Sequence, residues 1–374
     1  MVKSELFKWQ TSWCGDSGMS DAALVIYFAA PTVMRDHDVS ELLRKRYPQA
    51  RQIGCSSGGE IHDAEVLDDS ISGVALRFER AEFDIASANV CFGEDYKTGV
   101  ELASQLLRDD LKWVFVLSDG IKVNGSELVR GFAEVLPDNV LLTGGLAGGS
   151  PGLGESYVGL DGPPRALQVL ALGVYGSGMH CSSGSMGGWQ VFGPPRRITR
   201  SEGNILYELD GAPALDLYKH YLGAEAANLP GSALLYPLAI WAPGQDKQDV
   251  VRTISGVDEA SKSLIFTGDV PEGYSAKLMS ASFAQLARGA ELSAEQAQVS
   301  KDHQESLAIL VSCIGRKLLM GQMVADEVEA VKDVLPSETS ITGFYSYGEI
   351  APHGFTGNCQ LHNQTMTITT IWED

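Results

Sequence analysis

Three glycine-rich segments hold most of the side chains in this sequence that are suited to binding a small molecule. The segments read GCSSGGE, GGLAGG and GFYSYGE, and they begin at Gly54, Gly144 and Gly343. Glycine lets backbone N–H groups approach a ligand closely, while short hydroxyl and carboxylate side chains can hold its polar ends. We therefore predict a binding site built from Cys55, Ser56, Ser57, Glu60, Gly144, Gly145, Tyr345, Tyr347 and Glu349.

Two of these segments carry a carboxylate at the same offset from their first glycine, Glu60 in one and Glu349 in the other. Such a pair could hold the ammonium group of an amino acid, while turn N–H groups hold its carboxylate. The simpler alternative is that the glycines only satisfy the backbone demands of tight turns. Neither GxGxxG after a strand nor GxxxxGK[ST] occurs, so we do not predict a nucleotide site.

Three of the seven histidines lie beside the segments and are candidate axial ligands for haem. His62 follows the first segment, His353 follows the third, and His362 lies in the run LHNQTM beside Asn363, a further candidate ligand contact. A neutral imidazole is the usual iron ligand in gas sensors, so His362 is our candidate metal ligand, with His353 and His62 also considered. Each of them could equally be a hydrogen-bonding residue in a polar turn.

The cysteines favour binding over catalysis. The six cysteines are scattered without a CxxC pair, which is typical of free thiols in a reducing compartment. Cys55 could act as a nucleophile with Glu60 or Glu349 as acid or base, or it could be a small residue in a tight turn. No Cys–His arrangement of known spacing and no G-x-S-x-G elbow accompanies it. We expect a binding protein that is not an enzyme.

Each glycine-rich segment ends a similar series of predicted elements. An apolar strand, a helix stopped by proline and a second strand occupy residues 24–61, 113–149 and 307–350, and a further strand-like run follows each turn. Continuous apolar runs such as LVIYFAA indicate strands covered on both faces. The spacing suits βαβ units. We predict an α/β fold with mixed sheets built from repeated βαβ-like units, arranged in two lobes.

Charge and composition exclude several classes of partner. The formal net charge of the 374 residues is -20, which repels nucleic-acid backbones and anionic lipid. No apolar run approaches the ~20 residues of a membrane helix, and the N-terminus lacks the apolar centre of a signal peptide. We expect a cytoplasmic protein with no nucleic-acid partner and no membrane insertion.

Several motifs resemble the FIST family. GCSSGGEI, VLSDG, LLTGGLAGG and YELDGAPALDLYKHYLG are similar to its N-terminal domain, and VSCIGRKLLMG, TGFYSYGEIAP and LHNQTM are similar to its C-terminal domain. The resemblance covers nearly the whole chain. On this basis we predict an N-terminal extension at 1–23, a FIST N-terminal domain at 24–224 and a FIST C-terminal domain at 225–374.

The resemblance implies a small-ligand-binding sensory protein in bacterial signal transduction. Because the sequence contains no fused output domain, we expect it to act on a separate protein, and self-association is left open. One stand-alone branch of the family senses nitric oxide through haem and regulates a histidine kinase or a cyclic-di-GMP enzyme. Other members are proposed to bind amino acids or other small polar metabolites, and this alternative stays open.

Overall fold

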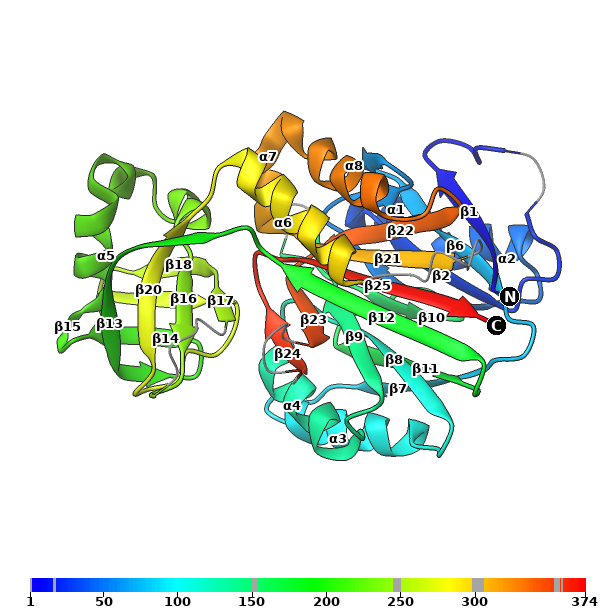
Figure 1. Ribbon diagram of the computed structural model, residues 1–374, viewed down its shortest axis with the longest axis horizontal. Coiled ribbons are helices and arrows are strands. Elements are labelled where there is room, and N and C mark those ends of the chain that lie inside the picture. Colours follow the sequence, from blue (N-terminus) through cyan, green and yellow to red (C-terminus); the bar gives the residue numbers. More distant parts are fainter. Residues whose placement is uncertain are drawn as a thin grey trace.

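The computed structural model describes residues 2–15, 18–149, 154–244, 250–297, 306–352, 357 and 359–374. Figure 1 shows a large body that contains both termini and a smaller lobe that is built mainly of strands. The chain leaves the body after strand β12 (Met179–Met186) and returns to it at helix α6 (Phe283–Gln296). The predicted α/β fold with two lobes is confirmed.

The body contains three mixed sheets with one common plan. The first has the order β1 (Lys3–Trp9), β6 (Ile71–Arg77), β2 (Leu24–Ala29), β3 (Arg51–Ser56) and β10 (Val158–Leu160). The second has the order β7 (Glu82–Asn89), β11 (Gln168–Tyr175), β8 (Leu111–Ser118), β9 (Leu141–Leu146), β23 (Gly348–Pro352) and β24 (Cys359–His362). The third has the order β12, β25 (Met366–Glu373), β21 (Ser306–Cys313), β22 (Thr339–Ser346), β4 (Glu60–His62) and β5 (Glu65–Leu67).

These sheets confirm the internal repeat. In each copy the first two strands run parallel, as β2 with β3, β8 with β9 and β21 with β22, and the third strand returns antiparallel to the first. In each copy a residue with positive φ lies just before the third strand. These residues are Asp69 (49°), Leu167 (57°) and Gln364 (62°). Three copies that share both their ladders and this uncommon backbone conformation are one structural unit used three times.

Each sheet is completed by a strand from another copy. Strand β10 of the second copy pairs with β3 of the first, β23 of the third pairs with β9 of the second, and β4 of the first pairs with β22 of the third. The exchange is therefore cyclic, and the two halves of the sequence share sheets. The predicted N-terminal extension contributes β1, which forms an edge of the first sheet.

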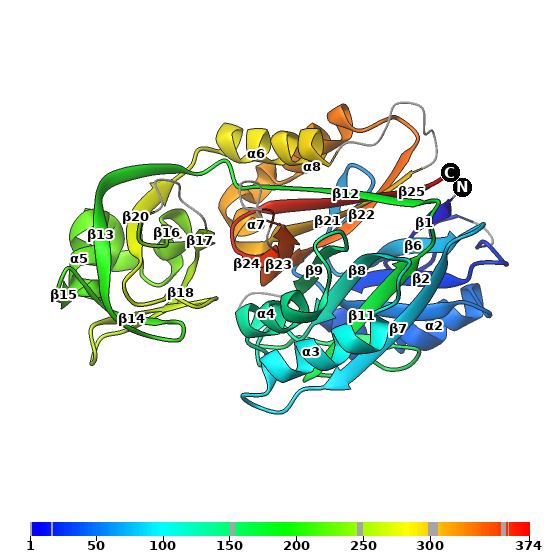
Figure 2. The same ribbon diagram turned by 60° about the horizontal axis from the view of Figure 1, so that its bottom comes forward.

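The inner faces of the three sheets enclose one apolar core, and helices cover the outer faces (Figure 2). In β2, Leu24, Ile26 and Phe28 face this central core, while Val25 and Tyr27 face the helical layer. The outer layers hold α1 (Pro31–Asp36) and α2 (Val39–Arg46) on the first sheet, α3 (Asp95–Leu106) and α4 (Gly125–Val135) on the second, and α6 with α8 (Ala325–Val334) on the third. Burial on both faces explains the continuous apolar runs of the first strands.

The small lobe is one strongly bent antiparallel sheet with its own apolar core. Its strands have the order β17 (Val250–Arg252), β16 (Leu238–Trp241), β20 (Ser275–Ser280), β13 (Gln190–Glu202), β14 (Ile205–Leu209), β19 (Ser263–Phe266) and β18 (Ile254–Asp258), and β15 (Ala212–Pro213) pairs with β14. Helix α5 (Ala214–Leu222), η1 (Gly223–Asn228) and η2 (Gly231–Leu235) complete it. The boundary predicted after residue 224 falls inside this lobe, and as a family boundary it stays a prediction.

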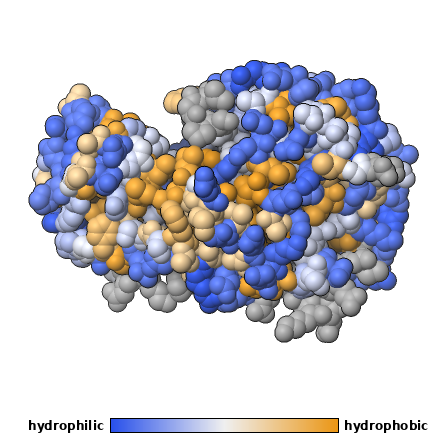
Figure 3. Space-filling view, turned by 90° about the horizontal axis from the view of Figure 1, so that it is seen from above, coloured by the Kyte–Doolittle hydropathy of each residue, from blue (hydrophilic) through white to orange (hydrophobic). Residues whose placement is uncertain are grey.

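The face that is uppermost in Figure 1 extends over both the small lobe and the body. It carries α6, α7 (Ile314–Met320) and η3 (Gly321–Met323), and apolar atoms run across it from the lobe to the body (Figure 3). Phe283, Leu318 and Met323 are the large apolar side chains of these elements that are exposed. None of the described helices is both long enough and apolar enough to cross a membrane.

Candidate functional site

The three glycine-rich turns meet at one point of the body. They are joined in a ring by equivalent backbone hydrogen bonds, each from an N–H of one turn to a carbonyl oxygen of another. These run from Gly58 to Tyr345 (2.8 Å), from Gly148 to Ser56 (2.9 Å) and from Tyr347 to Leu146 (3.1 Å). The strand exchange causes this meeting, because each turn connects a strand of one sheet to a strand of the next.

Polar groups within the ring form hydrogen bonds with one another and with neighbouring backbone groups. Ser56 donates its hydroxyl to the Gly148 carbonyl oxygen (2.6 Å) and accepts from Tyr157 N–H, and Ser57 bonds to the carbonyl oxygen and N–H of Gly59. A Cβ at Gly144, where φ is +147°, would lie 2.0 Å from the Val116 carbonyl oxygen. Close packing therefore accounts for this glycine, and Gly145 is similarly confined by Val311 and Phe344.

Glu60 and Glu349 occupy equivalent ladder positions, opposite Phe344 and Gly145. Glu349 accepts from the Ser346 hydroxyl (2.9 Å) and from the Thr365 N–H and hydroxyl (3.1 and 2.9 Å), so both of its oxygens are bonded. In Glu60, Oε2 accepts from the N–H and hydroxyl of Ser70 (3.2 and 2.6 Å). Its other oxygen, Oε1, is buried and has no hydrogen-bond partner within the described part of the chain.

Burial governs the charge of these two carboxyl groups. Desolvation raises the pKa of Glu60 to about 8, against the lowering effect of Ser70 and Lys317. Desolvation likewise raises the pKa of Glu349 to about 8, against its Thr365 and Ser346 donors. Both groups are therefore largely protonated at neutral pH, where each can donate as well as accept a hydrogen bond.

The other turn residues are also buried in the body. Cys55 lies in the central core, and burial raises the pKa of its thiol well above the usual value, which keeps it protonated. Tyr345 is fully buried and donates its hydroxyl to Glu327 (2.8 Å). Tyr347 is half-buried at the edge of the second copy's outer core, and burial raises its pKa. The structure thus brings the predicted residues together around a packed centre.

His362, our candidate metal ligand, does not fit an axial haem ligand as it is placed. His362 is 4% exposed, and its Nε2 lies 3.0 Å from the Ala351 carbonyl oxygen. His62 is half-buried with Nδ1 3.5 Å from the Ser72 hydroxyl, and burial together with Lys8 lowers its pKa, which keeps the ring neutral. His353 lies outside the described residues. Among those described, no three His, Cys, Asp or Glu side chains gather to hold a metal ion.

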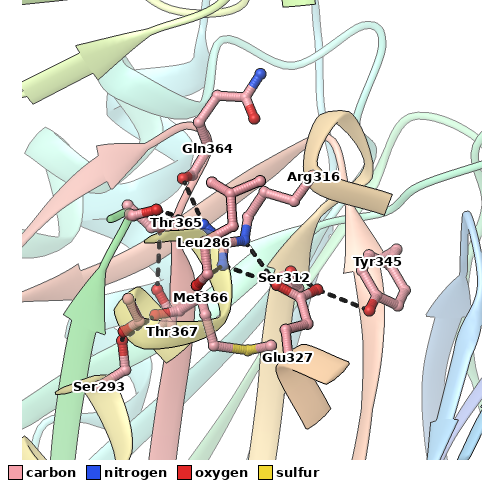
Figure 4. A network of polar contacts seen from close by, with 12 residues as sticks. Leu286, Ser293, Ser312, Arg316, Glu327, Tyr345, Gln364, Thr365, Met366 and Thr367 are labelled. Atoms are coloured by element: carbon pink, nitrogen blue, oxygen red, sulfur yellow. Dashed lines mark hydrogen bonds and ion pairs between the residues drawn. The ribbon is translucent and has the colours of Figure 1, made fainter. Parts of the chain in front are cut away.

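A buried ion pair organises the region where the small lobe joins the body, and our sequence analysis gave it no role. Arg316 of α7 and Glu327 of α8 are fully buried, with Nη2 and Oε2 2.8 Å apart. Arg316 also donates to the carbonyl oxygens of Gly187, Leu286 and Gln364 (Figure 4). Gly187 lies just before the small lobe in the chain and Leu286 lies just after it. The Arg316 guanidinium therefore bonds to both of the crossings, the two segments through which the chain passes between the body and the small lobe. An arginine directly after the largely apolar run LAILVSCIG is the signal that could have revealed it.

Further polar contacts join the two lobes directly. Asn124, the N-cap of α4, donates to the Asp269 carboxylate (3.2 Å), Arg252 donates to the Leu361 carbonyl oxygen (3.0 Å), and Gln364 donates to the Leu234 carbonyl oxygen (3.3 Å). Asn363, between the last two contacts in sequence, is 1% exposed. Neither polar atom of its side chain has a partner in the described structure.

The comparisons with known proteins identify two domains. The FIST N domain model matches residues 23–212, and the FIST C domain model matches residues 214–352. No curated protein matches the chain.

Two solved structures of cyanuric acid hydrolase are similar over the full chain length. The enzyme from A. caulinodans is 8% identical with a TM-score of 0.36, over 100% of this chain and 99% of that chain. The other is 11% identical with a TM-score of 0.34, over 100% of both chains. Likeness at this level carries no conclusion about this chain.

Proposed function

We propose that this chain, which belongs to the FIST family of small-ligand sensory domains in signalling, binds a small polar molecule where its two lobes meet and reports the binding to a separate protein. In this proposal the protein binds its ligand and does not catalyse a reaction. The family resemblance supports a histidine kinase or a cyclic-di-GMP enzyme as the protein that receives the signal. The cytoplasm is the proposed location.

The buried amide of Asn363 carries the proposal. An amide has two donor hydrogens and an accepting oxygen, and leaving them without partners in a buried place destabilises the free protein. Asn363 follows the segment that Arg252 of the small lobe contacts and precedes Gln364, which contacts Leu234 of the same lobe. A polar ligand that supplied the missing hydrogen bonds would therefore bind beside contacts that hold the lobes together.

Such a ligand can signal only through unequal affinity for two arrangements of the lobes. The direct contacts between the lobes include hydrogen bonds that are individually worth only about 1 kcal/mol. A ligand that binds one arrangement more tightly by a few kcal/mol would shift the population between them. The glycine turns form hydrogen bonds with one another, so we expect them to stay in place while the small lobe moves.

Calorimetric titration of the whole chain with the common amino acids and small polar metabolites tests the proposal. We expect one or more to bind the wild type and Asn228→Leu, a surface control, but to bind Asn363→Leu at least tenfold more weakly. Small-angle X-ray scattering should then show that the bound ligand changes the radius of gyration. Binding that survives in Asn363→Leu would contradict the placement, and a ligand without effect on lobe arrangement would contradict the sensory mechanism.

Haem-based nitric oxide sensing is the second candidate function, and the neutral, half-buried ring of His62 is the observation that favours it. When bound, haem would supply an iron centre for the gas. Titration with haem, followed by absorption spectroscopy, should give a sharp Soret band at one haem per chain that shifts with nitric oxide and is lost in His62→Ala. A broad, unsaturable signal would remove this candidate.

A further inference from the structure

Among the residues that the structure describes, two arginines are buried, and only one of them has a carboxylate partner there. Arg316 is paired with Glu327, as is usual for a buried charge. Arg252 of β17 is 6% exposed, and its guanidinium bonds to the carbonyl oxygens of Asp269 (2.9 Å), Leu361 (3.0 Å) and Val251 (3.3 Å). Within the described residues it forms no ion pair, and the Asp269 carboxylate accepts from Asn124 instead.

The Arg252 guanidinium stays charged at neutral pH. Burial lowers its pKa to about 10, and the negative charge of Asp269 partly opposes the shift. A buried cation without a counter-ion is unfavourable, because neutral carbonyl groups replace only part of the solvation that water supplied. Among the described residues, acceptors meet only its Nε and Nη1, and none meets its Nη2.

Arg252 lines a cleft of about 880 Å³ whose other lining residues all belong to the body. The other lining residues come mainly from α4, the segment after it, the start of β9 and β24, and they include Ser126, Arg130, Asp138 and Gln360. The Ser126 hydroxyl oxygen is buried and has no hydrogen-bond partner in the residues that are described. Arg130 is exposed and pairs with Glu127, which offsets its charge.

We propose that this cleft binds a small anion, a carboxylate or a phosphate, on the free side of the Arg252 guanidinium, with Ser126 as a second donor. A planar guanidinium fork and an unpartnered hydroxyl that line one cleft match the oxygens of such a group. The formal net charge of the chain is -20, so the surface in general repels an anion, and the Arg252 guanidinium is the group that would attract one here.

The inference rests on the proposed function only in supposing that a ligand acts where the small lobe meets the body. Asn363 is not among the residues that line this cleft, so the anion site is distinct from that amide. Arg252 belongs to the lobe, while Ser126 and Arg130 belong to the body. An anion held by both would hold the lobes in one arrangement. Anion binding can be measured whether or not any signalling protein responds to it.

Titration calorimetry at fixed ionic strength, with sodium phosphate and sodium succinate as probes and succinamide as the neutral counterpart, tests the assignment. We expect saturable one-site binding of at least one anion and no binding of succinamide. Arg252→Gln should weaken that binding at least about tenfold, because it removes charge-assisted hydrogen bonds. Arg200→Gln, which removes an exposed arginine of the same lobe paired with Glu208, gives the same change in net charge and should leave binding unchanged.

Circular dichroism shows whether Arg252→Gln is folded. If it is not, Arg130→Gln provides the test, because this exposed side chain can be replaced without burying an unpaired group, and it should weaken binding severalfold. Equal weakening in Arg200→Gln, equal binding of succinamide, or no saturable binding of either anion would overturn the proposal. Arg252-dependent binding that leaves the radius of gyration unchanged would support the anion site and contradict the sensory mechanism.

Discussion

At the scale of single residues, three buried glutamates of the body differ in their hydrogen-bond partners. Glu327 faces the Arg316 guanidinium and accepts further hydrogen bonds from Ser312 and Tyr345. Glu60 and Glu349 have hydroxyl and backbone N–H donors in the same surroundings. The hydrogen bonds to Glu60 and Glu349 do not compensate for the loss of water around them, so these two carboxyl groups are largely protonated at neutral pH.

The two protonated carboxyl groups make the stability of the fold depend on pH. Their pKa rises from 4.5 in the unfolded chain to about 8 in the folded one, so the folded state binds more protons between these values. Their contribution is fully present below pH 4.5 and is lost as pH rises through about 8, by up to about 1.4 kcal/mol per pH unit and group. Urea unfolding from pH 5 to 8 should show this fall, and Glu60→Gln or Glu349→Gln should flatten it. Glu101→Gln, at an exposed position, should not change the slope, and an unchanged slope in all three variants would contradict the burial argument.

Arg316→Met should destabilise the body by about 3 to 5 kcal/mol, because it leaves Glu327 buried without its counter-ion. Replacing Glu327 with Leu in the same chain should recover much of this loss, since no charge then stays buried. Urea unfolding of both single variants and the double variant measures the coupling. Arg288→Met, which breaks an exposed pair with Glu291 on α6, should cost less than about 1 kcal/mol. An equal cost for Arg316→Met and Arg288→Met would show that the buried pair has no special role.

At the scale of elements, α6 is pressed against the strand that leads into the small lobe. A Cβ at Gly184 of β12 would lie 2.0 Å from the Ser293 carbonyl oxygen, and one at Gly289 of α6 would lie 2.6 Å from the Gly188 nitrogen. The capping box of Ser282 and Gln285 starts the same helix directly after the lobe. The segment that enters the small lobe packs against α6, and the segment that leaves the lobe continues into α6. This packing limits how far the small lobe can move relative to the body.

Gly188→Ala should disturb this crossing far more than a comparable change elsewhere in the lobe. At Gly188 φ is +74°, and a Cβ would lie 1.9 Å from the Gln285 carbonyl oxygen. At Gly203 φ is +54°, and nothing lies within 4 Å of the added atom. Both alanines meet a backbone penalty of about 1 to 2 kcal/mol, and Gly188→Ala adds about 1 to 3 kcal/mol of overpacking. Urea unfolding compares them, and equal losses would mean that the crossing is loosely packed.

At the scale of the whole molecule, the cyclic exchange of strands makes the body one cooperative unit. Each sheet lacks an edge partner unless a strand of another copy joins it, and the three turns are bonded in a ring. The small lobe has its own sheet and its own apolar core. We therefore expect the three sheets of the body to unfold together and the small lobe to respond separately.

Gly148→Ala tests this division. A Cβ there would lie 2.1 Å from the Tyr345 carbonyl oxygen, which belongs to the ring. Hydrogen exchange followed by mass spectrometry should show loss of protection in β3, β9 and β22 together, while β13, β14 and β20 of the small lobe are nearly unchanged. Gly178→Ala, where nothing lies within 4 Å, should leave both patterns intact. Loss confined to β9, or equal loss in the lobe, would contradict the cooperative ring.

The repeat of strand, helix, strand and glycine turn was predictable from the chain itself because its signals are local. Apolar runs, prolines that stop helices and glycine turns act over a few residues and recur in all three copies. The proximity of the turns was also within reach, since the carboxyl ends of parallel strands are where such turns gather. The FIST motifs pointed to the family that the domain models match.

The state of the site was decided only by contacts between residues far apart in the chain. Glu60 is buried because β4 pairs with β22, whose Phe344 lies opposite it, and no local pattern announces that exchange. The same contacts close the turns and place Arg316 against Glu327. They also leave Arg252 in the wall of a cleft without an acidic partner among the residues described. Charge and accessibility depend on burial, and burial exists only once these distant segments have packed together.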